Sequence, residues 1–226
     1  MLVAIHNNER VFATEGGVGY CPECHESLIP ACGDIYIHHW RHKPESICTY
    51  GAGETTWHRR MKSLFPIECV EVRHGVNRSD VLLQNGTAIE FQNSSISITD
   101  IKTRRMSVDR MIWMFNLEKQ ADRDQLSVDG NMFWYNRPKE IFHLCMPHLF
   151  WYCSDEMILK VNYMNDDIVY DNVTGYNKKI TEGRCEKITL TEFVERAMKY
   201  DEQFKQPEKP PEIVQLKLFN INPQHD

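Results

Sequence analysis

One hairpin constrains the fold of this chain more than any other feature of its sequence. Residues 79–92 read SDVLLQNGTAIEFQ, two β-rich runs around Asn85-Gly86. An Asn-Gly pair between such runs is the strongest short-range signal for a β-hairpin. Asp80 opens the first strand, and Glu90 and Gln92 share one side of the second. The hairpin can therefore bring two carboxylates and an amide together.

These side chains suit a site for a divalent cation. Mg²⁺ prefers carboxylate and other oxygen ligands, and it is the usual activator of water in phosphodiester cleavage. Glu54 precedes the hairpin by one helix and is a candidate third carboxylate. Two simpler interpretations stay open: Asp80 only begins a strand, or Glu90 only faces solvent. However, Glu90 lies in a largely apolar run, where an unpaired buried carboxylate is unfavourable.

The segments around the hairpin predict a mixed sheet flanked by helices. Helical spacing of apolar residues predicts a helix over residues 54–65, ended by Pro66, on which Glu54, His58 and Lys62 share one face. Further elements are expected as follows: a strand over 67–73, a helix over 96–108 and a buried strand over 110–116.

The second half of the chain has weaker signals. It predicts strands over 131–135, 140–145 and 157–163, and a helix over 190–200 capped by Thr189 or Thr191. Residues 206–211, QPEKPP, are typical of a linker, and the apolar run at 213–218 could add an edge strand. The aromatic residues between Phe142 and Tyr152, with His143 and His148 among them, favour core packing over base stacking.

A second constraint is the density of cysteine and histidine between residues 21 and 50. Cys21 and Cys24 form a Cys-x2-Cys pair, and His39 and His42 form a His-x2-His pair. Such pairs can hold one structural zinc ion in a segment too small to fold alone. His38 or Cys48 could replace one histidine, and simple packing is the alternative to metal binding. The scattered cysteines, namely Cys69, Cys145, Cys153 and Cys185, are expected to be small buried residues.

Composition sets outer limits. The chain has 226 residues and a net charge of −6, which argues against a general nucleic-acid coat protein but not against a nuclease with a local basic patch. It contains no apolar run long enough to span a membrane and no signal peptide at its start. We therefore expect a cytoplasmic protein that does not contact membranes.

Several motifs together resemble the CoiA-like competence nuclease family of the PD-(D/E)XK superfamily, in an E-x-Q variant. The resemblance covers about residues 15–116. The matching motifs, in chain order, are CPEC at 21–24, HWRH at 39–42, E-x3-H-x3-K at 54–62, RSDV at 78–81, AIEFQNS at 88–94, and residues 101–113 with Arg104 and Arg105.

The resemblance implies a restriction-endonuclease-like α/β core behind a small zinc-binding module. Residues 1–50 would form the module, 51–145 the nuclease core and 146–226 a C-terminal extension. Asp80, Glu90 and the main-chain carbonyl of Phe91 would bind Mg²⁺ or Mn²⁺. Gln92 stands where the superfamily usually has lysine, so the positive charge would come from His58, Lys62, Arg104 or a second metal ion.

The expected function is metal-dependent hydrolysis of DNA in recombination, DNA uptake or defence against foreign DNA. Single-stranded and branched DNA are candidate substrates, and a second copy or another protein is a candidate partner. The alternative is a catalytically inactive module that binds nucleic acid or protein on a nuclease fold. Phosphate contacts in either case are expected from Arg59, Arg60, Lys62, Lys102, Arg104 and Arg105.

Overall fold

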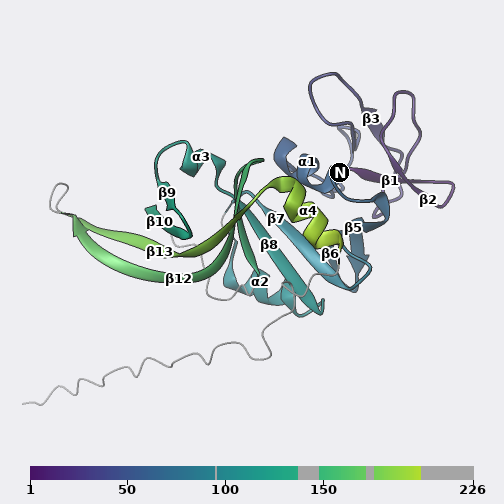
Figure 1. The fold of residues 1–226 in the computed structure, drawn as a ribbon. Helices are drawn as coiled ribbons and strands as arrows, with labels where there is room; N and C mark the ends of the chain where they lie inside the picture. The colour runs from purple at the N-terminus through teal and green to yellow at the C-terminus, as the bar shows by residue number, and fades with distance from the viewer. Residues whose placement is uncertain (95, 137–147, 172–175, 200–226) are drawn as a thin grey trace, which may run out of the picture.

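The computed structural model describes residues 1–94, 96–136, 148–171 and 176–199, and its centre is one nine-stranded sheet (Figure 1). The strand order is β5-β6-β7-β8-β11-β12-β13-β10-β9. β8 is parallel to both of its neighbours, β7 and β11, and the other pairs are antiparallel. The strands are β5 Val70–His74, β6 Asn77–Leu82, β7 Thr87–Gln92, β8 Arg110–Asn116, β9 Leu126–Asp129, β10 Met132–Asn136, β11 Leu149–Ser154, β12 Met157–Asp171 and β13 Tyr176–Ile188.

The predicted hairpin is confirmed as β6 and β7. Val81 lies opposite Ile89, and Leu82 lies opposite Ala88. Leu83 closes the turn by accepting a hydrogen bond from the Gly86 amide, and Gly86 has a left-handed backbone (φ 80°). A turn followed by one left-handed glycine is a common three-residue hairpin connection, in which glycine avoids the steric cost of positive φ.

Two helices cover one face of the sheet. α1 (Thr56–Ser63) is capped by the side chain of Thr55, and α4 (Leu190–Met198) by a capping box at Thr189. Met61 of α1 and Phe193 of α4 are fully buried against this face. The helices predicted over 54–65 and 190–200 are therefore confirmed, with shorter bounds. A 3-10 turn, η1 (Ile67–Cys69), joins α1 to β5.

The other face is covered by α2 (Ile98–Arg105) and α3 (Glu118–Ala121). The β9–β10 hairpin, at the end of the same sheet, also packs against this face. Ile101 of α2 and Phe133 of β10 are buried there, and the Phe133 ring contacts Trp151 of β11 at 4.7 Å. β8 is buried on both faces, as its apolar run predicts. The His148 imidazole is also buried, and its burial lowers its pKa to about 4.

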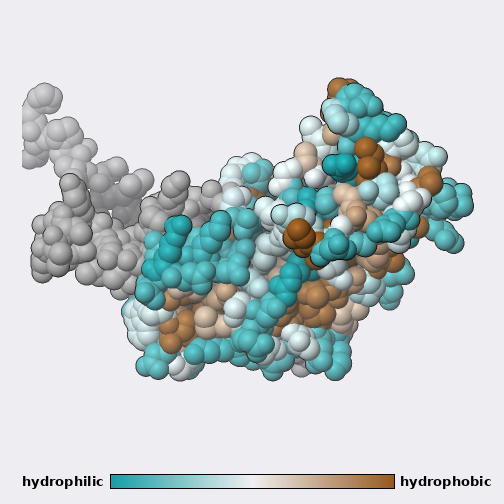
Figure 2. Space-filling model, turned by 90° about the horizontal axis from the view of Figure 1, so that it is seen from above, coloured by the Kyte–Doolittle hydropathy of each residue, from teal (hydrophilic) through white to brown (hydrophobic). Residues whose placement is uncertain are grey.

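A small N-terminal module precedes this sheet. It contains two two-stranded sheets, β1 (Val3–His6) with β2 (Glu9–Phe12) and β3 (Ile29–Ala31) with β4 (His39–Arg41). Its core is little more than Trp40 and five smaller side chains. A Cβ at Gly19 would lie 3.0 Å from the Trp40 ring, so glycine permits this packing. Ile35 and Ile47 are exposed, and hydrophobic residues form separate patches on the surface in Figure 2.

The predicted order of helix, three strands, helix and strand after residue 54 is confirmed. Strands of the C-terminal half continue the same sheet, since β11 pairs with β8 and β13 pairs with β10. The predictions for 140–145, 206–211 and 213–218, and for Phe142, His143 and Cys145, lie outside the described residues. Cys69, Cys153 and Cys185 are buried, as expected. Within the described residues, no helix has the length and hydropathy of a membrane span.

Candidate active site and metal centre

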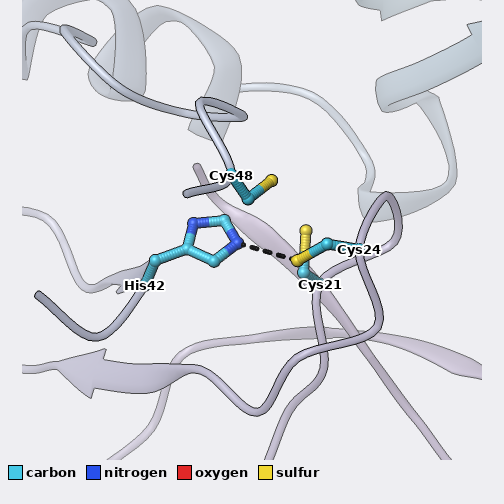
Figure 3. A group of neighbouring side chains, drawn as sticks. All are labelled: Cys21, Cys24, His42 and Cys48. Atoms are coloured by element: carbon cyan, nitrogen blue, oxygen red, sulfur yellow. Dashed lines mark hydrogen bonds between the residues drawn. The ribbon is translucent and has the colours of Figure 1, made fainter. Parts of the chain in front are cut away.

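Four side chains of the N-terminal module converge on one point (Figure 3). Their ligand atoms all lie within 4.8 Å of one another, and Cys24 Sγ is 3.3 Å from His42 Nε2. The set is Cys21, Cys24, His42 and Cys48, the only such group of three or more among the residues that the structure describes. Three thiolates and one imidazole at this separation fit a tetrahedral structural zinc site.

The thiol chemistry agrees with a cation at this point. Burial raises the pKa of the Cys21 thiol to about 11 in the metal-free protein, so its thiolate is costly without a positive partner. The amide of Glu23 donates to Cys21 Sγ at 3.3 Å, and the amide of His25 donates to the Cys21 carbonyl at 3.0 Å. These bonds fold the Cys-x2-Cys segment into the tight turn that a zinc knuckle requires.

His39 was expected among the zinc ligands, and the structure does not bring it to the cluster. His39 lies on strand β4, and His42 follows that strand. His42 lies beyond Arg41, the last residue of the strand, and its ring reaches the cluster, whereas the His39 ring does not. His39 Nδ1 instead donates to the Ile37 carbonyl at 3.0 Å, and burial lowers the pKa of its ring. Cys48, one of the open alternatives, takes the fourth place, while His38 is outside the cluster.

A cavity of about 390 Å³ lies between the module and the sheet. It gathers most of the side chains that were predicted for the active site, from α1, β6, β7 and α2. Its lining consists of Tyr50, Gly51, Ala52, Gly53, Glu54, His58, Lys62, Glu71, Arg78, Ser79, Asp80, Phe91, Gln92 and Arg104. Glu90 is not exposed in this cavity, since only 2% of its surface is accessible, but its partner Arg104 is part of the lining.

Lys62 is the buried cation at the centre of this cavity. Its ammonium group pairs with Glu54 and, at 2.6 Å, with Glu71, and it lies 3.9 Å from Asp80 Oδ1. Glu54 also pairs with Arg59 at 3.4 Å and with the Met1 amino group at 2.9 Å. These ion pairs outweigh burial and lower the pKa of Glu54. Glu54 precedes α1 rather than forming its first turn, so it reaches Lys62 from the loop.

Glu71 was not among the residues predicted for the site. It lies on β5 with a left-handed backbone (φ 54°), an unusual conformation for a residue other than glycine. Its carboxylate accepts hydrogen bonds from the amides of Leu2 and Val3 at 2.9 and 3.1 Å and from the Tyr50 hydroxyl at 2.8 Å. Against the effect of burial, Lys62, the Met1 amino group and the Leu2 amide lower the pKa of Glu71 to about 2. The sequence offered one signal, a carboxylate within the β-rich run predicted over residues 67–73.

Asp80 lies where β6 and β7 separate. Pairing in the hairpin ends at Val81 and Ile89, and the amide of Phe91 donates to Asp80 Oδ2 at 2.9 Å instead of continuing the ladder. Continuing the register places Asp80 opposite Glu90. Burial raises the pKa of Asp80, although Lys62 and the Phe91 amide oppose the shift.

Glu90 pairs with Arg104 of α2 through Oε2. Its other oxygen, Oε1, is buried and accepts no hydrogen bond from the described part of the chain. Burial, and next the charge of Asp80, raise the pKa of Glu90 to about 8. Glu90 thus keeps one buried oxygen without a hydrogen bond, and both carboxyl groups ionise at a cost that a nearby cation would offset.

His58 is fixed as a neutral ring beside the two carboxylates. Its Nε2 donates to the Phe91 carbonyl at 2.9 Å, so Nδ1 accepts from the Thr55 hydroxyl at 2.7 Å. Burial lowers the pKa of His58, in agreement with a neutral imidazole. Gln92 Nε2 donates to the Ser94 carbonyl at 3.0 Å. His58 therefore holds the Phe91 carbonyl, whereas the Gln92 amide is held by Ser94.

Several basic residues predicted to contact phosphate are used within the protein. Arg59 pairs with Glu54, Arg60 pairs with Asp155, and Arg104 pairs with Glu90. Lys62 is buried and pairs with Glu54 and Glu71. Of the six candidates, Lys102 is exposed on α2, and Arg105 is partly exposed and has interactions of its own. A basic groove is therefore not evident from these six residues.

The raised pKa of Glu90 predicts a pH-dependent stability. Because the folded pKa of about 8 lies above the ordinary 4.5, the protonated group stabilises the fold below pH 4.5, and this contribution is lost as the pH rises through about 8. Relative to Glu90→Gln, the wild type should lose on the order of 1 kcal/mol of unfolding free energy per pH unit in this range. Urea unfolding at pH 5, 7 and 9 measures it. Exposed Glu118→Gln is the control, and parallel curves for wild type and Glu90→Gln would contradict the assignment.

Comparison with known families bears on the N-terminal module. Residues 13–51 match the family model described as Competence protein CoiA, N-terminal domain. The matched stretch contains all four residues of the metal cluster. No curated protein and no solved structure matches the chain. The match therefore supports a competence-related assignment for the module, and the sheet that carries most of the cavity lies outside the matched residues.

Proposed function

We propose that this protein is a metal-dependent nuclease that hydrolyses DNA, in DNA uptake, recombination or defence against foreign DNA. The observation that carries the proposal is the pair Asp80 and Glu90 at the point where β6 and β7 separate. Asp80 Oδ2 accepts a hydrogen bond from the Phe91 amide, and its Oδ1 lies 3.9 Å from the Lys62 ammonium. Glu90 Oε2 pairs with Arg104, and its buried Oε1 accepts no hydrogen bond from the described residues. The match to the CoiA N-terminal domain supports the competence-related context.

The donor set fits Mg²⁺ or Mn²⁺, which favour carboxylate and carbonyl oxygen. Asp80, Glu90 and the Phe91 carbonyl would hold the ion. Burial raises the pKa of both carboxyls, and a bound cation would lower it. When bound, such an ion supplies charge stabilisation for the phosphate and an activated water. The reaction adds water across the P–O bond, leaving a phosphate on one end and a hydroxyl on the other.

The chain's own residues position this chemistry. Lys62, held by Glu54 and Glu71, provides the positive charge that Gln92 lacks relative to the usual lysine of the superfamily. Gln92 can hydrogen-bond a water through its amide, and neutral His58 orients the Phe91 carbonyl. The helix–three strands–helix–strand order, with β7 parallel to β8, supports a restriction-endonuclease-like core.

One observation favours the alternative of an inactive binding module. Arg104 already neutralises Glu90, and Lys62 neutralises Glu54 and Glu71, so the carboxylates are partly balanced without a metal ion. A nuclease that has lost its activity could keep these ion pairs in place of a bound metal ion. The two functions differ in one measurable property, which is cleavage in the presence of a divalent cation.

The test is cleavage of labelled duplex, single-stranded and branched DNA with Mg²⁺ or Mn²⁺. Asp80→Asn is expected to lower the rate at least about 10³-fold with the fold intact, because it removes a ligand that acts with the others as a unit. Asp129→Asn, an exposed change on β9, should cut like the wild type. A folded Asp80→Asn variant that cuts DNA at the wild-type rate would show that Asp80 is not a ligand of a catalytic metal ion. DNA binding without cleavage by any form would favour the inactive module.

A further inference from the structure

The zinc cluster and the cavity are joined by a continuous series of contacts. Two residues of the module start it: Glu23, between the ligands Cys21 and Cys24, and Tyr50, two residues after the ligand Cys48. Both contact the sheet at β5 and β6. Neither contact follows from a role in zinc binding alone, since neither residue is a ligand.

Tyr50 makes two contacts with the sheet. Its hydroxyl donates to Glu71 Oε2 at 2.8 Å, and the Arg78 guanidinium lies 4.4 Å above its ring. Hydrogen bonds to a charged acceptor are among the stronger contributors to stability.

Glu23 reaches the same place from the other side of the zinc cluster. Its carboxylate pairs with Arg78 and, at 3.0 Å, with Arg73. Arg78 also donates to the Glu71 carbonyl at 2.7 Å. The module therefore contacts the strand pair β5–β6 through Arg78 and Glu71. Arg78 is two residues before Asp80.

The last step leads into the cavity. Glu71 binds the Lys62 ammonium at 2.6 Å, and Lys62 lies 3.9 Å from Asp80. The left-handed backbone of Glu71 interrupts regular pairing between Val70–Val81 and Val72–Ser79, so its side chain can turn toward Lys62. Such a conformation costs on the order of 1–3 kcal/mol and persists only where the surroundings enforce it.

The net negative charge of the N-terminal module indicates that it contacts strands β5 and β6 rather than the phosphates of DNA. Residues 1–50 hold six acidic side chains and three basic ones, so the module is poorly suited to bind phosphate itself. The acidic residues are Glu9, Glu15, Glu23, Glu26, Asp34 and Glu45, and the basic ones are Arg10, Arg41 and Lys43. Its core is too small to hold residues 21–50 without the metal.

We propose that metal binding at the Cys3His site, which consists of Cys21, Cys24, His42 and Cys48, positions side chains that line the cavity. Zinc fixes Glu23 and Tyr50, these fix Arg78 and Glu71, and Glu71 sets the place of Lys62 beside Asp80. Glu71, Tyr50 and Arg78 are positioning residues that act through Lys62. Only the relevance to DNA cleavage rests on the proposed function, because the coupling itself exists whether or not the protein cuts DNA.

Tyr50→Phe tests the coupling in the full-length, zinc-loaded protein without DNA or Mg²⁺. It removes one hydroxyl and keeps the ring beneath Arg78. The ¹⁵N signal of the Lys62 ammonium, assigned with Lys62→Arg, should shift, and its protons should exchange with water about tenfold faster. Because the two sites are coupled, zinc affinity in chelator competition should also fall, by about fivefold or more. Tyr20→Phe makes the same change on an exposed tyrosine of the module and should alter neither quantity.

The expected result is a change in both readouts for Tyr50→Phe and in neither for Tyr20→Phe. A normal Lys62 signal in Tyr50→Phe would overturn the proposal, because Lys62 would then be placed independently of the module. Zinc affinity equal to wild type would overturn it as well. Loss of cleavage plays no part in either readout, so a protein that proves not to be a nuclease still decides this question.

Discussion

Cys48→Ser is expected to lose its zinc, whereas His39→Asn keeps it. Cys48 supplies the fourth ligand atom within 4.8 Å of the others, whereas His39 is outside that group and hydrogen-bonds to the Ile37 carbonyl. Even partners outside the first coordination shell are worth 10- to 100-fold in metal affinity, so loss of the Cys48 thiolate should exceed about 100-fold. Metal analysis of the purified variants, followed by chelator competition, measures both. Because the core of the module is small, we expect its folding to depend on this ion, so the amide NMR signals of the module should lose their dispersion in Cys48→Ser.

This pair of variants separates two ligand sets that the sequence leaves open. Retention of zinc by Cys48→Ser together with its loss from His39→Asn would restore the Cys2His2 set. Cobalt(II) adds an independent readout, because three thiolates give stronger charge-transfer absorption than two. A Cys69→Ser variant, which removes a buried thiol outside the cluster, controls for the general cost of losing a cysteine.

Glu71→Gln is expected to destabilise the fold by about 3–5 kcal/mol at pH 7, because it leaves the Lys62 ammonium buried beside one fewer carboxylate. Glu71 is 4% exposed and binds Lys62, Tyr50 and the amides of Leu2 and Val3. Urea unfolding gives the difference. Glu68→Gln, an exposed change three residues earlier, should stay within about 0.5 kcal/mol of the wild type.

The same variant has a defined pH dependence. The folded pKa of Glu71, about 2, lies below the ordinary 4.5, so its ionised form stabilises the fold above pH 4.5 and this contribution is lost as the pH falls through about 2. The difference between wild type and Glu71→Gln should therefore be constant from pH 5 to 7 and shrink between pH 4.5 and 2. A difference that stays constant down to pH 2 would show that Glu71 is not held as an anion.

The elements that sequence reasoning identified are those encoded by neighbouring residues. Asn85-Gly86 specified the hairpin, and the apolar run at 110–116 specified a strand buried on both faces. The cap at Thr189 was one of two candidates, and the structure selects it through its bond to Glu192. Each of these signals depends on contacts within a few residues, which a single sequence displays directly.

The features that were missed depend on distant contacts. His39 and Cys48 could not be ranked without knowing that residues 39–41 form a strand, since strand and turn place a histidine pair differently. The role of Glu71 depends on amides nearly seventy positions away and on a positive φ that no residue type indicated. The long pairing of β12 with β13 and the return of β10 to β13 are likewise set by tertiary structure.

The parallel pairing of β8 with β11 has a consequence for synthesis on the ribosome. β8 ends at Asn116, but its partner begins at Leu149, and the helix α4 that covers the same core follows at Leu190. Until those segments emerge, β8 exposes an apolar edge that can pair with other chains. The half of the protein that carries the candidate chemistry therefore depends on its C-terminal half to become soluble, and a fragment ending near residue 116 should aggregate rather than fold.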